Sequence, residues 1–137
     1  MTRYLFGLIL AAGLFCSCKK AIEQKKEDLV LDAMTNGQWY VYSFQEAGVN
    51  LTPDFAPYSF QFYRDGRVDA LTPAGIENQG NWEANVSSLT IESAFPDATD
   101  PIRKLNAVWK LVDNSWTYVK AETTVDGLKR QLHLKKK

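Results

Sequence analysis

The stretch from Gly37 to the C-terminus alternates apolar and polar residues, and turn residues recur at intervals of about eight to twelve positions. A period of two is typical of strands that turn one face toward a core, so this stretch predicts an all-β domain. We expect strands within residues 38–45, 58–63, 68–71, 76–83, 89–92, 107–112, 116–120 and 128–135.

Turn residues indicate how these strands connect. Asp65-Gly66 is expected to form a tight hairpin turn, and Asp126-Gly127 precedes the final strand. Gly80, inside a predicted strand, is expected to mark a bulge or a bend. The longest interruption is Ser93–Leu105, where we expect a loop with a short helical turn.

The N-terminus has the layout of a secretory signal. Arg3 is followed by an apolar run of twelve residues from Tyr4 to Phe15, and small Ser17 then precedes Cys18. The run is shorter than the roughly 20 residues that a transmembrane helix needs. We therefore expect residues 1–17 to be a signal peptide.

The junction Phe15-Cys16-Ser17-Cys18 resembles the lipobox of bacterial lipoproteins, in which an apolar residue lies three places before the modified cysteine and a small one directly before it. The resemblance implies that Cys18 carries acyl chains such as palmitate. Two or more buried chains hold a protein stably at a membrane. A disulfide or zinc site is a weaker interpretation, since a C-x-C pair is at most half of a zinc site and Cys16 would leave with the signal.

The resemblance to lipoproteins also implies a location. Lipoproteins without Asp directly after the cysteine usually go to the outer membrane, and this position is Lys19. An acidic run that marks surface export in some Gram-negative groups is replaced by Lys19-Lys20-Ala21-Ile22, so we expect a periplasm-facing position.

Residues 18–36 are expected to form a lipidated tether and a short helix that ends at Asn36-Gly37. The predicted apolar face carries Ile22, Leu29 and Ala33, with Val30 and Met34 beside it. We expect this face to pack on the following domain. An amphipathic helix at the membrane surface is the alternative.

Five motifs along residues 34–136 resemble the lipocalin-like domains of small bacterial lipoproteins. They are Gly37-Gln38-Trp39, Tyr58-Ser59-Phe60-Gln61-Phe62 with Asp65-Gly66, Gly80-Asn81-Trp82, Trp109-Lys110-Leu111-Val112-Asp113 and Leu132-His133-Leu134. The resemblance implies an eight-stranded antiparallel β-barrel, closed or partly open, over residues 37–137. In lipocalins a late arginine packs over the first-strand tryptophan, which implies a structural pairing of Arg130 with Trp39.

Two functions follow from such a barrel. Eight strands enclose a space that side chains can fill or that can hold one small ligand. The first hypothesis is a module that binds a small hydrophobic or amphipathic ligand. Its expected lining is aromatic and consists of Trp39, Tyr58, Phe60, Phe62, Trp82, Trp109, Trp116 and Tyr118.

The alternative is a structural or interaction lipoprotein, with a filled barrel that binds another envelope protein. Two loops are candidates for this contact: Gly48–Pro57, where Leu51 and Phe55 are expected to be exposed, and Phe95–Ile102. A cavity inside the barrel would favour a ligand, and a filled barrel with an apolar rim would favour a protein partner.

The composition argues against other classes of function. Removal of Arg3 with the signal leaves 15 basic and 16 acidic residues, so no concentrated basic face points to nucleic acid. His133, the single histidine, alternates with leucines and is expected to be solvated on the polar face. No nucleophile motif accompanies it. We expect a non-enzymatic protein without a cofactor or a metal site.

Overall fold

The computed structural model describes the backbone of residues 7–137 and the side chains of residues 20–137. The signal prediction for residues 1–17 and the side chain of Cys18 therefore lie outside the residues that are described in full. Helix α1 spans Gly7–Thr35, and the short 3-10 helices are η1 Thr52–Phe55 and η2 Ile102–Leu105. The strands are β1 Trp39–Glu46, β2 Val49–Asn50, β3 Ser59–Phe62, β4 Arg67–Thr72, β5 Gly75–Asn85, β6 Thr90–Ala94, β7 Ala107–Asn114, β8 Tyr118–Val125 and β9 Leu128–Lys136.

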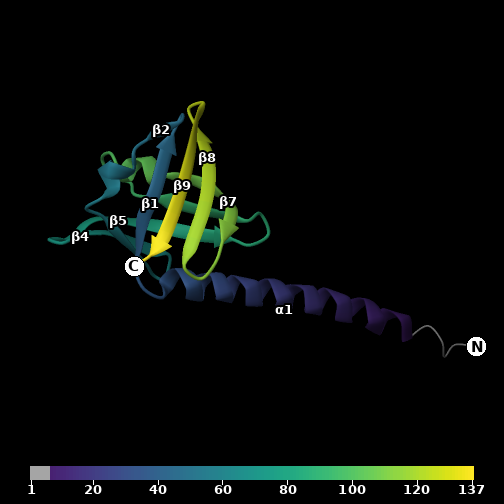
Figure 1. The fold of residues 1–137 in the computed structure, drawn as a ribbon. Coiled ribbons are helices and arrows are strands. Elements are labelled where there is room, and N and C mark those ends of the chain that lie inside the picture. The colour runs from purple at the N-terminus through teal and green to yellow at the C-terminus, as the bar shows by residue number, and fades with distance from the viewer. Residues whose placement is uncertain (1–6) are drawn as a thin grey trace, which may run out of the picture.

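Eight of these strands close into an antiparallel barrel (Figure 1). Their order is β1-β3-β4-β5-β6-β7-β8-β9, and β9 pairs back onto β1 from Trp39↔Lys136 to Glu46↔Arg130. The extra strand β2 pairs with the Glu46 end of β1. The predicted eight-stranded all-β barrel is confirmed, and the barrel is closed.

The closure is uneven around the barrel. Strands β1 and β9 pair along nearly their whole length, whereas β1 and β3 share the single residue pair Trp39↔Phe60. We call this β1–β3 junction the seam. Beyond it, Leu51 N donates to Phe44 O at 2.8 Å and Phe44 N donates to Thr52 Oγ1 at 2.9 Å. The connection to η1 therefore covers the part of β1 that β3 does not reach.

The hairpin at Asp65-Gly66 forms with a different turn from the one that Asp-Gly pairs favour. Only Gly66 has a positive φ, of 93°, and its N–H donates to Tyr63 O at 3.1 Å. This is a type I turn followed by a left-handed glycine. Asp126 and Gly127 both have positive φ, of 51° and 77°, as the type I′ turn between β8 and β9 requires.

Two apolar residues that were predicted to start strands lie in turns instead. Leu89 has a φ of 54° and is 54% exposed, and β6 begins one residue later. Trp116 lies between β7 and β8 and is 55% exposed. Both side chains continue the apolar alternation of the sequence, so periodicity alone could not assign them to turns.

Gly80 marks a close approach between segments and not a bulge. A Cβ atom at this position would lie 2.3 Å from Ala94 O and 2.8 Å from the ring of Phe95. The irregularity in the β4–β5 pairing lies elsewhere, between Ala70 and Leu71. Glycine is therefore needed at position 80 because the Phe95 ring packs directly on the β5 backbone.

Helix α1 is longer than predicted, and it contacts the barrel through its C-terminal end only (Figure 1). The predicted stop is correct, since the helix ends at Thr35. The predicted face is not: Met34 is buried and Val30 and Leu31 pack beside it, while Leu29 is 46% exposed. Among the residues with described side chains, no helix is long and apolar enough to cross a membrane.

Candidate functional site

The interior of the barrel is almost filled by its own side chains. The remaining apolar cavity has a volume of about 40 Å³, and its walls include Phe62, Trp109 and Leu132. Pockets that hold drug-sized ligands measure roughly 300–1,000 Å³. The Ser93 hydroxyl in the wall donates to the Leu105 carbonyl, so it is already bonded. A hydrophobic or amphipathic ligand therefore has no room inside this barrel.

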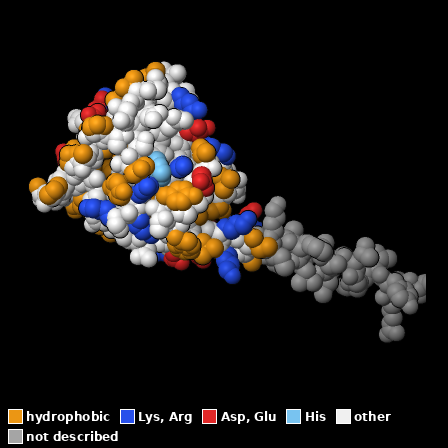
Figure 2. All heavy atoms as spheres, viewed as in Figure 1, with side chains coloured by type: hydrophobic (Ala, Val, Ile, Leu, Met, Phe, Trp, Pro, Cys, Tyr) orange, Lys and Arg blue, Asp and Glu red, His pale blue; other side chains and the backbone are white. Residues whose placement is uncertain are grey.

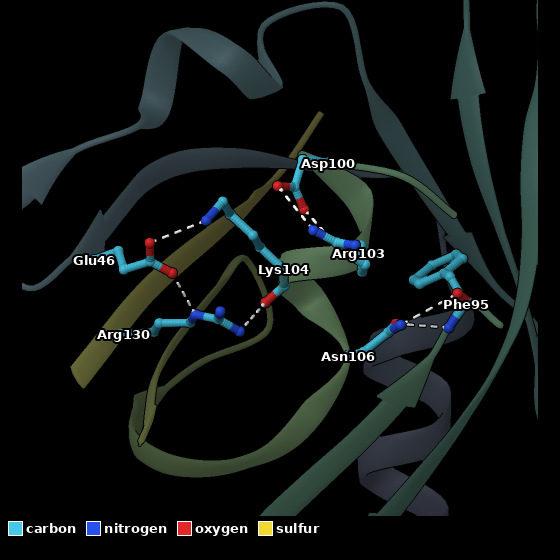
Figure 3. Close-up of polar contacts among 7 residues, drawn as sticks. All are labelled: Glu46, Phe95, Asp100, Arg103, Lys104, Asn106 and Arg130. Atoms are coloured by element: carbon cyan, nitrogen blue, oxygen red, sulfur yellow. Dashed lines mark hydrogen bonds and ion pairs between the residues drawn. The ribbon is translucent and has the colours of Figure 1, made fainter. Parts of the chain in front are cut away.

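The segment Phe95–Asn106, which we call the lid, contributes much of this filling. Its side chains Phe95, Ala98, Ile102 and Leu105 are buried in the core cluster. Asn106 bonds both backbone groups of Phe95, accepting from its N–H at 2.7 Å and donating to its carbonyl at 3.2 Å (Figure 3). The lid is thus fixed in a closed position over the core.

An ion-pair cluster joins the lid to the closing strands of the barrel. Glu46 on β1 accepts hydrogen bonds from Lys104 Nζ at 2.9 Å and from Arg130 Nε on β9 at 2.7 Å (Figure 3). Arg130 Nη1 also donates to the Lys104 carbonyl at 3.1 Å. The bond from Lys104, followed by the bond from Arg130, lowers the pKa of Glu46 below its usual value of 4.5. At neutral pH the charged side chains of this cluster bind the lid to strands β1 and β9.

The predicted pairing of Arg130 with Trp39 is not formed. The register of β1 and β9 places Arg130 opposite Glu46, at the far end of the strand pair from Trp39. The cation over the Trp39 ring is Lys136, with Nζ 5.1 Å from the ring centroid. Because the closing strand continues past Arg130, its last lysine takes the place that the resemblance gave to arginine.

Five of the eight predicted ligand-lining residues are core residues: Trp39, Phe60, Phe62, Trp82 and Trp109 are all buried. Trp39 and Trp82 do not border the cavity. Trp39 Nε1 donates to Met34 O at 2.9 Å, and Trp82 Nε1 donates to Tyr63 O at 2.8 Å. Phe60, Phe62 and Trp109 do border the internal cavity, as predicted, but its volume of about 40 Å³ is well below that of a pocket for a drug-sized ligand.

The other three predicted lining residues lie on the outside of the barrel. Trp116 is in an exposed turn. Tyr118 lies on the outer face of β8, where its hydroxyl donates to Asp113 at 3.0 Å. Tyr58 borders a groove at the seam. Outward aromatic residues cannot be separated from inward ones by residue type, which explains these errors.

The two loops proposed as apolar contact sites fold inward. Phe55 is 1% exposed and packs on Phe44 with ring centroids 4.9 Å apart. Leu51 is partly buried against the core, and the lid residues Phe95 and Ile102 are buried. The predicted contact residues of these loops therefore fill the barrel end, and Val49 is the exposed large apolar side chain that the first loop retains.

A surface groove at the seam, which we call the seam groove, has a volume of about 710 Å³. It forms where β1 and β3 diverge beside the β4–β5 hairpin. Its walls are mostly aromatic or apolar, from Tyr40, Ala56, Pro57, Tyr58, Leu71 and Pro73, and its polar groups come from Gln38, Ser59, Thr72 and Lys137. Apolar walls with a few polar groups are the usual composition of a small-molecule site.

The polar groups of the seam groove include a tyrosine that stays protonated at neutral pH. Burial raises the pKa of Tyr58, and the negative charge of Glu77 raises it further. Its hydroxyl can therefore act as a donor. Ser59 Oγ donates to Gln38 Oε1 at 3.2 Å, which leaves the amide nitrogen of Gln38 as a second donor. Tyr40, Leu71 and Pro73 were not predicted as site residues, because only the seam brings them together.

His133 lies on the outer face of β9 as predicted, but it is only partly exposed. Its ring packs between Tyr42 and Tyr118, with centroids at 4.9 and 5.9 Å. Burial, with smaller effects from Lys120 and Lys135, lowers the pKa of His133. No group of three or more metal-ligating side chains lies together in residues 20–137.

Comparisons with known proteins show a shared fold. No protein-family model matches the sequence, and no curated protein matches it. The structure is similar to the crystal structure of a DUF4847 family protein from Bacteroides vulgatus ATCC 8482, with a TM-score of 0.56 and 15% sequence identity. The match covers 77% of this chain and 96% of that one.

Proposed function

We propose that this chain is a non-enzymatic lipoprotein of the cell envelope that binds a small hydrophobic or amphipathic ligand in the seam groove. The observation that carries the proposal is the contrast between about 40 Å³ inside the barrel and about 710 Å³ in the groove. Binding would thus differ from that of a lipocalin, since the ligand would lie on the outside of a filled barrel. The tyrosine rings would contact its apolar part.

The anchoring part of the proposal rests on the lipobox resemblance at Cys18. Helix α1 runs unbroken from this position to Thr35, which corresponds to about 25 Å at 1.5 Å per residue. An acylated Cys18 would therefore hold the barrel on a helical spacer, on the periplasmic side of the outer membrane. The spacer would leave the seam groove open to ligands that leave or enter the bilayer.

The ligand is tested by native mass spectrometry of the full chain extracted from its host membrane. We expect a copurified small molecule, and we expect Leu71→Arg to abolish its binding because a charge would enter the apolar groove. Trp116→Ala, which changes an exposed aromatic residue elsewhere, should retain the ligand. Absence of any copurified molecule, together with no thermal stabilisation by added lipids, would reject a ligand-binding function.

The anchor is tested by Cys18→Ala. We expect this variant to leave the membrane fraction and to lose labelling by an acyl probe, because the thiol is the proposed attachment atom. Cys16→Ala should remain attached and labelled. Continued labelling of Cys18→Ala would show that the lipid is on another residue.

A protein partner is the second candidate function. It is favoured by three exposed apolar side chains: Val108 and Val112 on the outer face of β7 and Trp116 in the β7–β8 turn, which are 52%, 61% and 55% exposed. Such a patch is typical of an interaction site. A photo-crosslinking residue at Val112 should then give one discrete adduct in cells, and the same residue at exposed Val49 should not.

A further inference from the structure

The outer face of β1, β9 and β8 carries a cluster of aromatic and basic side chains that neither proposed function uses. We call it the outer cluster: Tyr42, Tyr118, Lys120, His133 and Lys135. Figure 2 shows the single histidine, in pale blue, surrounded by hydrophobic and basic side chains on one face of the barrel. Lys135 Nζ lies 3.6 Å from the centroid of the Tyr42 ring, and Lys120 Nζ lies 6.0 Å from that of Tyr118.

A β-bulge lies at Tyr42 within this cluster. The β1–β9 register shifts between Val41 and Ser43, so Tyr42 is the additional residue. Val41 is buried and Tyr42 is half exposed, as strand alternation requires, and the Tyr42 ring packs beside His133. The bulge lets the next residue, Ser43, lie opposite His133 on the outer face as well. A second shift lies in the β7–β8 pairing between Leu111 and Asp113, and it places Asp113 opposite Lys120. Bulges often occur where a site needs a side chain to be redirected.

The two lysines of the outer cluster have no acidic partner within residues 20–137. Other lysines of the barrel do: Lys104 pairs with Glu46 and Lys129 pairs with Glu122. Asp113, which lies opposite Lys120 in the β7–β8 pairing, accepts a hydrogen bond from the Tyr118 hydroxyl. The outer cluster therefore carries two positive charges that no ion pair neutralises.

A hollow of about 190 Å³ adjoins these charges. Hydrogen-bonding side chains line part of it, and Val112, Ala121 and Leu132 form its apolar part. Lys120 and His133 form one side, with Ser43, Gln45 and Gln131 next to them. Glu122 also borders the hollow, where Lys129 Nζ lies 3.5 Å from its carboxylate and offsets its charge. The Nε2 atom of His133 is buried without a hydrogen-bond partner among the described residues, which is rare for a native polar group.

We propose that this hollow binds the phosphate group of a ligand. The ammonium of Lys120 would supply the charge, and the amides of Gln45 and Gln131 would donate to the remaining oxygens. Lys135 lies over the Tyr42 ring, and Tyr42 packs against His133. Neither side chain makes a hydrogen bond or an ion pair within residues 20–137, so both can move aside. A phosphate oxygen that took their place would give His133 Nε2 the partner that it lacks.

The experiment uses the ring signals of His133 in nuclear magnetic resonance, since the chain has one histidine. The full chain is placed in phosphatidylcholine bicelles and studied in two arms. The first arm adds glycerol 3-phosphate, and the second replaces part of the lipid with phosphatidic acid. We expect a saturable shift of the His133 signals, weakened about tenfold in Lys120→Gln because a charged donor is lost. Lys26→Gln, on exposed α1, is the matched control.

The two arms identify the source of the phosphate. A shift in the first arm alone indicates a soluble ligand, a shift in the second arm alone indicates a lipid headgroup, and a shift in both shows that the phosphate itself is recognised. No saturable shift in either arm would overturn the proposal, and so would an equal shift in Lys120→Gln. Neither result bears on the seam groove, which lies on the β3 side of β1.

Discussion

Gly80 has a requirement that only the folded barrel reveals. Its backbone supports the Phe95 ring of the lid, and the space for a Cβ atom is taken by Ala94 O at 2.3 Å. Backbone atoms cannot move aside as the end of a flexible side chain can. The contact at this residue thus decides whether the lid can seat over the core.

We expect Gly80→Ala to lower the free energy of unfolding by about 2 kcal/mol or more, because a methyl group must displace the lid or strand β6. Chemical denaturation measures the change. Asn81→Ala, at the next and outward-facing position of β5, should alter stability by less than about 0.5 kcal/mol. Equal losses in the two variants would mean that the β5 backbone, and not the missing Cβ, is the sensitive feature.

Glu46 makes the stability of the lid dependent on pH. Its pKa is lowered in the native state, mainly by the hydrogen bond from Lys104, so folding is favoured wherever the carboxylate is ionised. This contribution is complete above the ordinary value of 4.5 and is lost as the pH falls through the lower native pKa. The carboxylate is 15% exposed, and solvent screening reduces its contribution only in part.

Glu46→Gln should therefore destabilise the protein by about 1–2 kcal/mol near neutral pH, and the difference from the native chain should shrink in acid. Urea denaturation at about pH 7 and about pH 3 checks both parts. A deficit that is constant over this range would show that the glutamine disturbs packing and that the charge of Glu46 contributes little.

At the scale of elements, the last turns of helix α1 determine how the helix packs against the barrel. Met34 is 3% exposed, lines the small cavity, and its carbonyl accepts the Trp39 indole N–H. Leu29, which the periodicity placed on the contact face, is 46% exposed. Only the final turns of the helix contact the barrel, so the apolar residues that precede them have nothing to pack against.

We expect Met34→Ala to cost about 2–3 kcal/mol of unfolding free energy, since a cavity would open at the α1 end of the core. Leu29→Ala should be nearly neutral because Ala favours helix and the side chain is largely exposed. Thermal unfolding of the two variants side by side makes the comparison. A larger loss of unfolding free energy in Leu29→Ala than in Met34→Ala would support the contact face that the sequence predicted.

The existence and order of the elements could be predicted from the sequence, because alternation and turn residues are local signals. Strand ends were harder to predict. Leu89 and Trp116 continue the apolar alternation of the sequence, yet both lie in turns. Phe55 and the lid aromatic Phe95 were expected on loop surfaces, and both are buried because those loops fold back over the core. Whether a loop covers the barrel depends on contacts far apart in the sequence, which periodicity does not record.

At the scale of the whole molecule, the sites could be predicted least. The seam groove depends on β1 and β3 meeting at one residue pair, and the outer cluster depends on the pairing of β9 with β1 and β8 around His133. Both are features of strand register, and register is set by the closed barrel. The sequence supplied the aromatic residues, but the fold decided which of them face a core, a groove or solvent.

Because the interior is filled, we predict that the barrel binds a small apolar molecule only when its internal cavity is enlarged. Trp109→Ala and Leu132→Ala would each remove part of the wall of the 40 Å³ cavity and enlarge it. Enclosed apolar cavities of about 150 Å³ stay dry and bind benzene. We expect both variants to lose about 2–5 kcal/mol of stability and to recover part of it when benzene is added, because a ligand that binds only the folded state stabilises it.

The native chain should show no such stabilisation, and neither should Trp116→Ala, whose indole is 55% exposed outside the barrel. Unfolding temperatures with and without benzene make the measurement, and two enlarged variants are used because the loss of Trp109 could by itself prevent folding. If benzene stabilised the native chain as much as the variants, the interior would admit ligands after all. The seam groove would then lose the argument that favours it, since the barrel itself could hold the ligand.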